Sequence, residues 1–322
     1  MKKQIIIIFG QTGVGKTDFA DLLAQQIPSE IINMDVGQFY TPLTIGTAKP
    51  DWKHASVPYH MFDILDSPTD YTVMMYRKRL LELMHTIWQA GKVPIIVGGS
   101  GFYLKSIFFP PHAPSGATMR EVVPEWFENK SLQELWQELF MIDPVRAETI
   151  EKHDRYRIER ALTIWKTSNI KPSEYRTPYQ PPADFTLLFL TRDRSELYTR
   201  IDNRVIGMME QGFLDEVRSL RGTAWEQFLL QKKLIGYNEL LDYFSGDETE
   251  ERLRQAIVRM QSRSRQYAKR QHTFWNMLQR QFDMVKTENQ EHQVAAHIES
   301  VNLTLLNINL YITLLRRRVL HS

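Results

Sequence analysis

The sequence predicts an α/β fold in which a parallel sheet core is interrupted by a helical insertion domain. The first observation is a set of short, continuous apolar runs, which are typical of strands buried on both faces of a parallel sheet. The second is that these runs alternate with longer stretches of helical spacing. The third is a stretch without strong apolar runs, bounded by proline-rich segments.

The N-terminal part of the chain alternates short apolar runs with helical patterns. Ile5 to Phe9 is a continuous apolar run, which predicts a central strand. "TDFADLLAQQI" follows it with apolar residues at helical spacing. Gly91 is expected to end the helix predicted for "YRKRLLELMHTIWQAGK". Further strands are predicted in "EIINMD", "HMFDIL" and "VPIIVGG", of which the second has the weakest pattern.

Two proline-rich segments, "PPHAPSGA" and "KPSEYRTPYQPP", mark changes in pattern. Between them the chain has helical patterns, whereas a buried-strand pattern, "FTLLFLTRD", and a long helical pattern from Leu197 to Leu220 follow. We therefore expect a core formed by residues 1–111 and 183–285, and a helical insertion domain at 112–182. The tail, 286–322, fits an added strand, a surface helix or a partner-binding segment, and its role stays open.

Composition limits the classes of protein to which the chain can belong. Of its 322 residues, 43% are hydrophobic, and the formal net charge is +2, which by itself does not indicate nucleic-acid binding. The sequence contains no cysteine, which excludes disulfides, thiolate metal sites and a cysteine nucleophile. The apolar runs near both ends are too short for a signal segment or a membrane span. We therefore expect a soluble, cytoplasmic protein without a membrane partner.

The strongest local motif is "GQTGVGKT", which fits the phosphate-binding pattern G-x-x-x-x-G-K-[ST]. It follows a predicted strand and opens a predicted helix, so its backbone N–H groups would converge on an anion. This predicts a P-loop NTPase-like core that binds a diphosphate or a triphosphate, with the Thr17 hydroxyl as a Mg²⁺ ligand. The residues assigned to this site are Gly10, Gln11, Thr12, Gly13, Val14, Gly15, Lys16 and Thr17.

The irregular segment "MDVGQFYTPLTIGTAKP" begins with a second candidate site residue, Asp35. The carboxyl ends of parallel strands open on the same crevice as the phosphate loop, so Asp35 is expected near Lys16. From the residues alone, three roles fit Asp35. It could be a magnesium ligand or substrate base of a small-molecule kinase, a base for a nucleophile that attacks a diphosphate-activated carbon, or a helix N-cap.

Motifs spread along the chain are more specific than the phosphate loop alone. They are "INMDVGQFY", "IGTAKP", "VPYHMFDI", "VPIIVGGSGFYLKSI", "RYRIERALTIW", "LYTRIDNRVIGMMEQGFLDEV", "LIGYNELLDYFSG" and "SRQYAKRQHTFW". Their order and spacing resemble the bacterial tRNA dimethylallyltransferase (IPP transferase) family from about residue 3 to 285. The resemblance implies transfer of a dimethylallyl group from dimethylallyl diphosphate. The acceptor would be the exocyclic amine of the adenosine 3′-adjacent to the tRNA anticodon.

The resemblance also implies roles for individual residues. Asp35 would be the general base that takes a proton from the adenine amine, with Lys16 and Ser100 as further catalytic residues. Gln38 matches the glutamine of the family's D-S-x-Q motif, which contacts the target nucleotide, and Ser100 matches a threonine of the same site. The tRNA contacts that the resemblance implies are Asp35, Val36, Gly37, Gln38, Ser100, Arg120, Tyr156, Arg157, Ile158, Glu159 and Arg160.

The chain departs from the family's pattern at several positions. Val36 stands where the family has serine, which removes one hydroxyl from the nucleotide site, whereas Ser100 keeps the hydroxyl of the usual threonine. Gln11 and Val14 replace a proline and a serine that are frequent in the family's phosphate loop. The phosphate loop and the base are retained. The hydroxyl missing at Val36 bears on the affinity of the site for the adenine and on the rate of its reaction.

Basic residues suggest where an RNA would bind. Arg252, Arg259, Arg263 and Arg270 fall on one helical stripe, which fits either a solvated face or contacts with RNA phosphates. The expected partners are dimethylallyl diphosphate and the anticodon stem-loop of tRNA, the expected cofactor is Mg²⁺, and the protein is expected to be a monomer. Three alternatives stay open: a P-loop kinase for a nucleoside or small molecule, a related prenyltransferase that modifies free adenine nucleotides, and a tRNA-binding homologue with weakened catalysis.

Overall fold

The computed structural model describes residues 2–111, 126–288 and 294–321. The chain divides into two compact units. The first unit comprises Met1–Phe108 and Pro181–Ser322, and the second comprises Phe109–Gln180. Within the described ranges, no helix combines the length and the apolar character that crossing a membrane requires.

The first unit is built on a six-stranded sheet whose neighbouring strands are all parallel, in the order β3-β2-β4-β1-β5-β6. The interior of β1 is buried because apolar side chains on both of its faces meet covering helices. The predicted α/β class with a parallel sheet is confirmed. The strands are β1 (Gln4–Gly10), β2 (Ser29–Asn33), β3 (Tyr59–His60), β4 (Val93–Gly98), β5 (Asp184–Thr191) and β6 (Ala296–Asn302).

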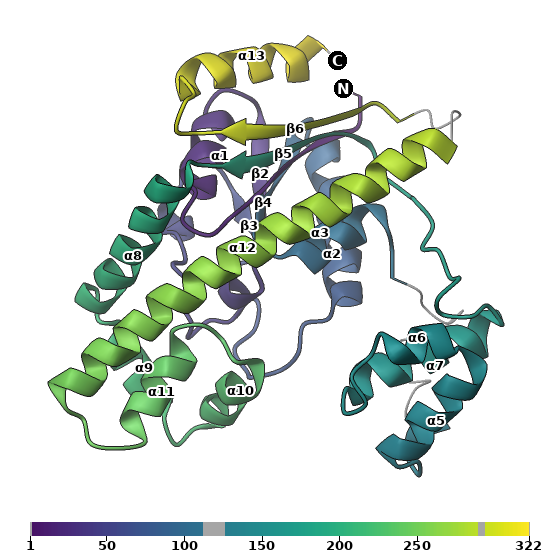
Figure 1. Ribbon diagram of the computed structural model, residues 1–322. Coiled ribbons are helices and arrows are strands. Elements are labelled where there is room, and N and C mark those ends of the chain that lie inside the picture. The colour runs from purple at the N-terminus through teal and green to yellow at the C-terminus, as the bar shows by residue number, and fades with distance from the viewer. Residues whose placement is uncertain (1, 112–125, 289–293, 322) are drawn as a thin grey trace. The chain divides into compact units, whose positions relative to one another are not determined.

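Helices cover both faces of this sheet (Figure 1). On one face, Ile6 and Ile8 of β1 share an apolar core with α1 and α13. On the other face, Trp275 of α12 stacks on Phe189 of β5, with ring centroids 4.7 Å apart, and Phe108 of α3 packs against Phe185. The helices concerned are α1 (Lys16–Ala24), α2 (Val73–Gln89), α3 (Gly101–Phe108), α12 (Glu250–Glu288) and α13 (Ile308–His321).

A second apolar core of the first unit lies among four short or medium helices and part of α12, and includes Tyr40 and Leu43 of the irregular segment after β2. The long helical pattern predicted from Leu197 to Leu220 is divided in two, because Gly212 adopts φ 95° between α8 and α9. This arrangement connects the irregular segment to helices that lie far away in the sequence. The helices are α8 (Arg194–Glu210), α9 (Phe213–Leu220), α10 (Ala224–Lys232) and α11 (Tyr237–Phe244).

The weakest predicted strand is shorter than expected, whereas the tail forms a strand and a helix, two of the elements that its sequence allowed. The strand predicted in "HMFDIL" is reduced to β3, because Met61 and Asp63 have φ of 64° and 50°, outside the strand region. The tail contributes both an added strand and a helix: β6 pairs with β5 from Phe185 to Thr191, and α13 packs against α1. The described part of the tail therefore extends the core sheet.

The second unit is helical around its own small apolar core. Ser131 and Glu134 form a capping box at the start of α5, which satisfies backbone N–H groups that the helix leaves unpaired. The Asp143 carboxylate caps α6 in the same way by accepting from the Arg146 N–H at 3.0 Å. The helices are α5 (Leu132–Ile142), α6 (Pro144–Glu148) and α7 (Arg155–Ser168).

Candidate active site

The phosphate loop connects β1 to α1. Gly15 adopts φ 101°, in the left-handed region that favours glycine, and α1 begins at the next residue. The first N–H groups of α1 have no partner within the helix, so together with the helix dipole they attract an anion. The Lys16 ammonium donates to the carbonyl oxygens of Gly10 and Gln11, at 3.1 and 2.8 Å, and therefore lies over the same loop.

Arginines that sequence patterns did not assign to the site hold this loop. Arg192 donates from Nε to the Val14 carbonyl at 2.9 Å, and Arg200 donates from Nε to the Gly13 carbonyl at 2.9 Å. Arg200 and Arg204 of α8 both line the pocket described below. Their spacing of four residues, which puts them on one helix face, was the signal in the sequence that could have identified them.

Gln271 of α12 joins two loops of the site from a distant part of the chain. This buried side chain accepts from the Thr12 N–H at 2.7 Å and donates to the Gly99 carbonyl at 2.9 Å. Gln11, assigned from the sequence to phosphate binding, directs its side-chain amide to α12 instead, where it donates to the Ala268 carbonyl at 3.2 Å. The phosphate loop and the loop after β4 are therefore held together by α12.

Asp35 follows β2 and has two roles in the structure. Its Oδ1 accepts from the Gly37 N–H at 3.2 Å, so it caps the short helix η1 (Val36–Phe39). It also lines the same pocket as Lys16. Burial raises the pKa of the Asp35 carboxyl above its usual value, although the positive charges of Lys16 and Arg204 oppose this rise.

Lys16 and Asp35 are electrostatically coupled. Burial lowers the pKa of the Lys16 ammonium to about 8, Asp35 opposes this shift, and the like charge of Arg204 adds to it. The two side chains thus favour each other's charged form at the bottom of the pocket. The arrangement provides a cation for a phosphate group and, close to it, a carboxylate that can accept a proton.

Ser100 comes next to Asp35 because the ends of β2 and β4 approach closely. Gly98 permits this approach, since a Cβ atom there would lie 2.2 Å from the Met34 carbonyl oxygen. The Ser100 N–H donates to that oxygen at 3.3 Å, and the Val36 N–H donates to Ser100 Oγ at 3.4 Å. Ser100 therefore adjoins the start of η1, although it is not one of the described residues that line the pocket.

The three residues after Asp35 differ in what they offer to a ligand. Val36 packs its side chain against the core formed by α8 to α11, and Gly37 is buried. Gln38 lines the pocket, and its Nε2 donates to the carbonyls of Thr47 and Ala48 at 3.1 and 3.2 Å. Of these three residues, Gln38 is therefore the one that lines the pocket.

These elements enclose a pocket of about 640 Å³ in the first unit. Its size lies within the range of small-molecule sites. Its basic side chains are Lys16, Arg200 and Arg204, and its acidic ones are Asp18 and Asp35. Apolar lining comes from Ala20, Ile31, Ala48, Pro50, Phe62 and Val97. The residues assigned from the sequence that line it are Thr12, Gly13, Gly15, Lys16, Thr17, Asp35 and Gln38.

In the second unit, the expected RNA-contacting segment forms the first turn and a half of α7. Tyr156 is 72% exposed, and the Arg157 side chain is 60% exposed while it pairs with Asp154 at 3.1 Å. An exposed aromatic ring beside an exposed guanidinium offers a stacking surface and a phosphate contact. These two side chains are available on the surface of the second unit.

The other residues of this segment are placed differently. Ile158 is fully buried in the apolar core of the second unit, so its side chain holds α7 in place and is not available to RNA. Glu159 pairs with Arg155 at 2.7 Å, and Arg160 is half-buried. Arg120, assigned to tRNA binding from the sequence, lies outside the described residues.

Most of the arginine stripe of α12 has a structural role. Arg252 donates to the Asp242 carbonyl at 2.9 Å, and Arg259 pairs with the Asp242 carboxylate at 2.8 Å. Arg263 pairs with the buried carboxylate of Glu239. These three arginines therefore hold α11 against α12, a structural role that their spacing in the sequence did not reveal, and contact with RNA stays a hypothesis for this stripe.

Comparison of the sequence with known proteins indicates one family. The family model for IPP transferases matches residues 38–278. The tRNA dimethylallyltransferase of Thermotoga petrophila is 36% identical over 273 residues, which cover 83% of this chain and 88% of the relative. That of Syntrophobacter fumaroxidans is 37% identical over 277 residues, which cover 84% and 80%.

Solved structures of similar proteins share the fold. A full-length tRNA isopentenylpyrophosphate transferase from Bacillus halodurans superposes with a TM-score of 0.65 at 28% identity, covering 99% of this chain and 96% of that one. A eukaryotic dimethylallyltransferase acting on tRNA gives a TM-score of 0.69 at 29% identity, covering 84% and 69%. The resemblance seen in the sequence motifs is thereby confirmed, and the chain belongs to the IPP transferase family.

Proposed function

We propose that this protein transfers the dimethylallyl group of dimethylallyl diphosphate to the exocyclic amine of the adenosine 3′-adjacent to the tRNA anticodon. The observation that carries this proposal is that the phosphate loop and Asp35 face one pocket of about 640 Å³. The relatives named tRNA dimethylallyltransferase support this choice of donor and acceptor. We expect the protein to act as a cytoplasmic monomer.

Mass spectrometry of tRNA nucleosides tests this activity directly. After incubation with dimethylallyl diphosphate and Mg²⁺, the adenosine next to the anticodon is expected to carry one dimethylallyl group in place of an amine hydrogen. Nucleosides that stay unmodified while the protein is folded would contradict the proposal. Val36 places no hydroxyl beside Asp35. The rate of modification also shows how active the site is without this hydroxyl.

The basic end of the pocket suits a diphosphate leaving group. As the allylic carbon–oxygen bond breaks, negative charge grows on the diphosphate, and donors already in place stabilise it without reorganisation. Lys16, Arg200 and Arg204 line this pocket, and the N-terminus of α1 opens on it. The diphosphate departs as one unit, so the protein needs to bind it and not to split it.

Asp35 supplies the base for the acceptor. An adenine amine is a weak nucleophile, and it gains from losing a proton as its nitrogen forms the bond to the allylic carbon. The raised pKa of Asp35 makes its carboxylate a better proton acceptor than an ordinary aspartate. The adenine must leave its stack in the anticodon loop to reach this pocket, as in base flipping.

Oxygen atoms in the pocket lining fit the ligand preference of a magnesium ion. Thr17, Asp18 and Asp35 offer oxygen atoms there, and Mg²⁺ prefers a few protein oxygens together with phosphate oxygens and water. No cluster of three or more His, Cys, Asp or Glu side chains suited to a metal occurs in the described ranges. We propose that the Thr17 hydroxyl is the protein ligand, and that the ion neutralises diphosphate charge.

A bell-shaped pH dependence of kcat/KM is expected for the donor. Towards low pH, Asp35 becomes protonated and loses its function as a base. Because burial raises the pKa of Asp35, this acid limb is expected at a higher pH than for an ordinary aspartate. Above about pH 8, Lys16 loses the proton that attracts the diphosphate. Since bound diphosphate favours the ammonium form, the alkaline limb of kcat is expected at higher pH than that of kcat/KM. Coincident alkaline limbs would contradict the assignment to Lys16.

The exposed start of α7 is proposed as a tRNA contact. Replacing Arg157 and Arg160 with alanine is expected to weaken tRNA binding and to flatten the dependence of affinity on salt, because fewer counterions are released. The loss of two phosphate contacts would change the slope of log affinity against log salt by about 1 to 2. Arg218→Ala, which removes an exposed arginine paired with Asp215, is a matched control. A slope equal to that of the control would remove these residues from the interface.

A further inference from the structure

One part of the pocket wall is supplied by the chain between η1 and α2. Ala48, Pro50, Tyr59 and Phe62 line the pocket there, although this stretch contains only the short helix η2 (Trp52–His54) and the two-residue strand β3. Irregular chain has no helical or sheet ladder to fix its shape. Something else must therefore hold this wall in place.

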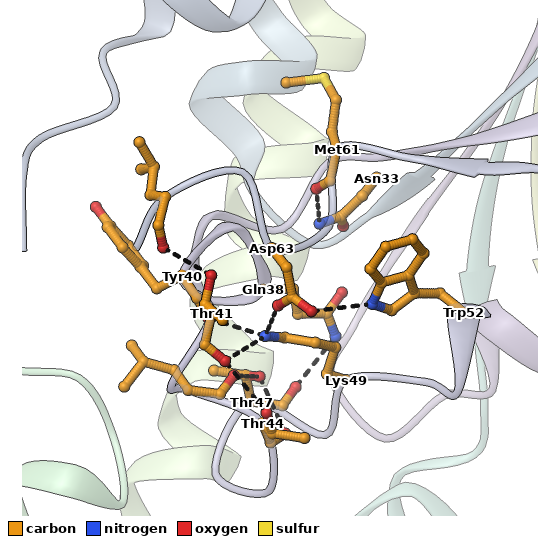
Figure 2. Close-up of polar contacts among 12 residues, drawn as sticks. Asn33, Gln38, Tyr40, Thr41, Thr44, Thr47, Lys49, Trp52, Met61 and Asp63 are labelled. Atoms are coloured by element: carbon orange, nitrogen blue, oxygen red, sulfur yellow. Dashed lines mark hydrogen bonds and ion pairs between the residues drawn. The ribbon is translucent and has the colours of Figure 1, made fainter. Parts of the chain in front are cut away.

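A largely buried ion pair joins Lys49 and Asp63, which adjoin wall residues in the chain (Figure 2). The Lys49 side chain is only 2% exposed, and its ammonium pairs with the Asp63 carboxylate. The same ammonium donates to the Tyr40 carbonyl at 2.8 Å and to the Thr41 carbonyl at 3.4 Å. Three acceptors match the three N–H bonds of an ammonium, so the charge is fully satisfied.

Asp63 makes further hydrogen bonds besides its ion pair with Lys49. Its second carboxylate oxygen accepts from Trp52 Nε1 at 3.3 Å, and its backbone N–H donates to the Gln38 carbonyl at 3.3 Å. The pair therefore ties the segment around Lys49 to the segment around Asp63, and both to η1. Each partner is next to pocket residues: Lys49 lies between Ala48 and Pro50, and Asp63 follows Phe62.

The backbone of this wall is strained. Ala48, Met61 and Asp63 have φ of 46°, 64° and 50°, and they are three of the five non-glycine residues with positive φ in the described ranges. Such conformations cost free energy and persist only where surrounding contacts impose them. Asn33 contributes one such contact, because its amide donates to the Met61 carbonyl at 2.9 Å.

A buried ion pair is a weak source of stability, because removing both charges from water costs about as much as their attraction returns. The position of this ion pair beside the pocket residues offers another explanation for its presence. We propose that Lys49 and Asp63 are positioning residues that set the shape of the pocket wall at Ala48, Pro50 and Phe62, and thereby the size of the allylic group that the pocket accepts. This inference rests on the proposed function and adds a determinant of donor specificity to it.

The effect on specificity follows from the apolar part of the pocket lining, to which Ala48, Pro50 and Phe62 belong. A pocket that discriminates by shape loses about tenfold or more in selectivity when it admits one or two extra methylene groups. If the wall relaxes, a donor longer than dimethylallyl diphosphate, such as geranyl diphosphate, is better accommodated. Water also enters more readily, so diphosphate is released by hydrolysis without an RNA acceptor.

The test compares Lys49→Met with the double variant Lys49→Met/Asp63→Asn. The single variant leaves the Asp63 charge buried without its partner and is expected to lower stability, whereas the double variant removes both charges and regains much of it. Lys2→Met is the control, because Lys2 is exposed and pairs with Asp184, which lies at the opposite end of the β5 strand from the site. Thermal unfolding, and kcat and KM with dimethylallyl and geranyl diphosphate, are measured for each protein with tRNA.

We expect the double variant to be folded and its preference for dimethylallyl over geranyl diphosphate to fall about tenfold or more, with faster release of diphosphate in the absence of tRNA. The control is expected to keep the wild-type preference. A folded double variant with unchanged donor preference would overturn the inference, as would a double variant that does not fold, because the pair would then serve the fold alone. Failure of the proposed function itself is distinguishable, since wild-type protein would then modify no tRNA with either donor.

Discussion

Asp35→Asn is expected to lower kcat by about 10²- to 10⁴-fold, the range over which a positioned general base acts. Asparagine keeps the size of the side chain and an oxygen that can accept from the Gly37 N–H, so the cap of η1 is retained. It cannot take the amine proton. Binding of the donor is expected to be preserved or strengthened, because the variant removes a negative charge beside the diphosphate site. Steady-state kinetics and a direct binding assay for the donor check both parts.

Asp215→Asn is a suitable control for this variant. Asp215 is an exposed aspartate on α9, and its carboxylate pairs with the exposed Arg218. Its replacement is expected to leave kcat unchanged. A second signature belongs to Asp35 alone: because its charge raises the pKa of Lys16, the alkaline limb of kcat/KM is expected to move to lower pH in Asp35→Asn. Wild-type kcat in this variant would exclude Asp35 as the base.

Lys16→Ala is expected to lower kcat by about 10²- to 10³-fold, comparable to the loss of one preorganised donor to a developing anion. The donor KM is also expected to rise, because the ammonium attracts diphosphate in the ground state as well as in the transition state. Arg200 and Arg204 line the same pocket and are expected to sustain the residual activity. Kinetics with varied donor separate the two effects.

The pH profile distinguishes the role of Lys16 from general damage to the loop. Without a group of pKa about 8 in the pocket, the alkaline limb of kcat/KM is expected to disappear from Lys16→Ala. Lys2→Ala removes an exposed lysine at the start of the chain and is the control. An alkaline limb that persists unchanged in Lys16→Ala would show that another group titrates, and would remove Lys16 from this step.

The proximity of Lys16 and Asp35 could be predicted from the sequence because it follows from local pattern and one rule of topology. Each residue follows a recognisable buried strand, and parallel strands place their carboxyl ends at one edge of the sheet. The sequence pattern also indicated the irregular chain after Asp35, since its glycines and prolines interrupt any apolar period. These are short-range signals that do not depend on how distant segments pack.

The remainder of the site depends on long-range contacts that no local pattern encodes. Gln271 bonds to Thr12 across 259 residues, and Arg192 bonds to Val14 across 178 residues. The arginine stripe of α12 shows the same limit: its spacing was recognised, but the acidic partners on α11, such as Glu239, decide its role. The partial alternation of the tail likewise did not reveal that β6 would pair with β5.

The phosphate loop is expected to hold a leaving group and not to transfer a phosphoryl group. Release of diphosphate from dimethylallyl diphosphate, followed with and without tRNA and in the absence of ATP, distinguishes the two. Release is expected to depend on tRNA, to need no ATP, and to be lost when the target adenosine is replaced by guanosine, which presents a carbonyl where the amine nucleophile was. Conversion of ATP to ADP with a small-molecule acceptor, while dimethylallyl diphosphate stays intact in the presence of tRNA, would contradict this expectation and indicate a P-loop kinase.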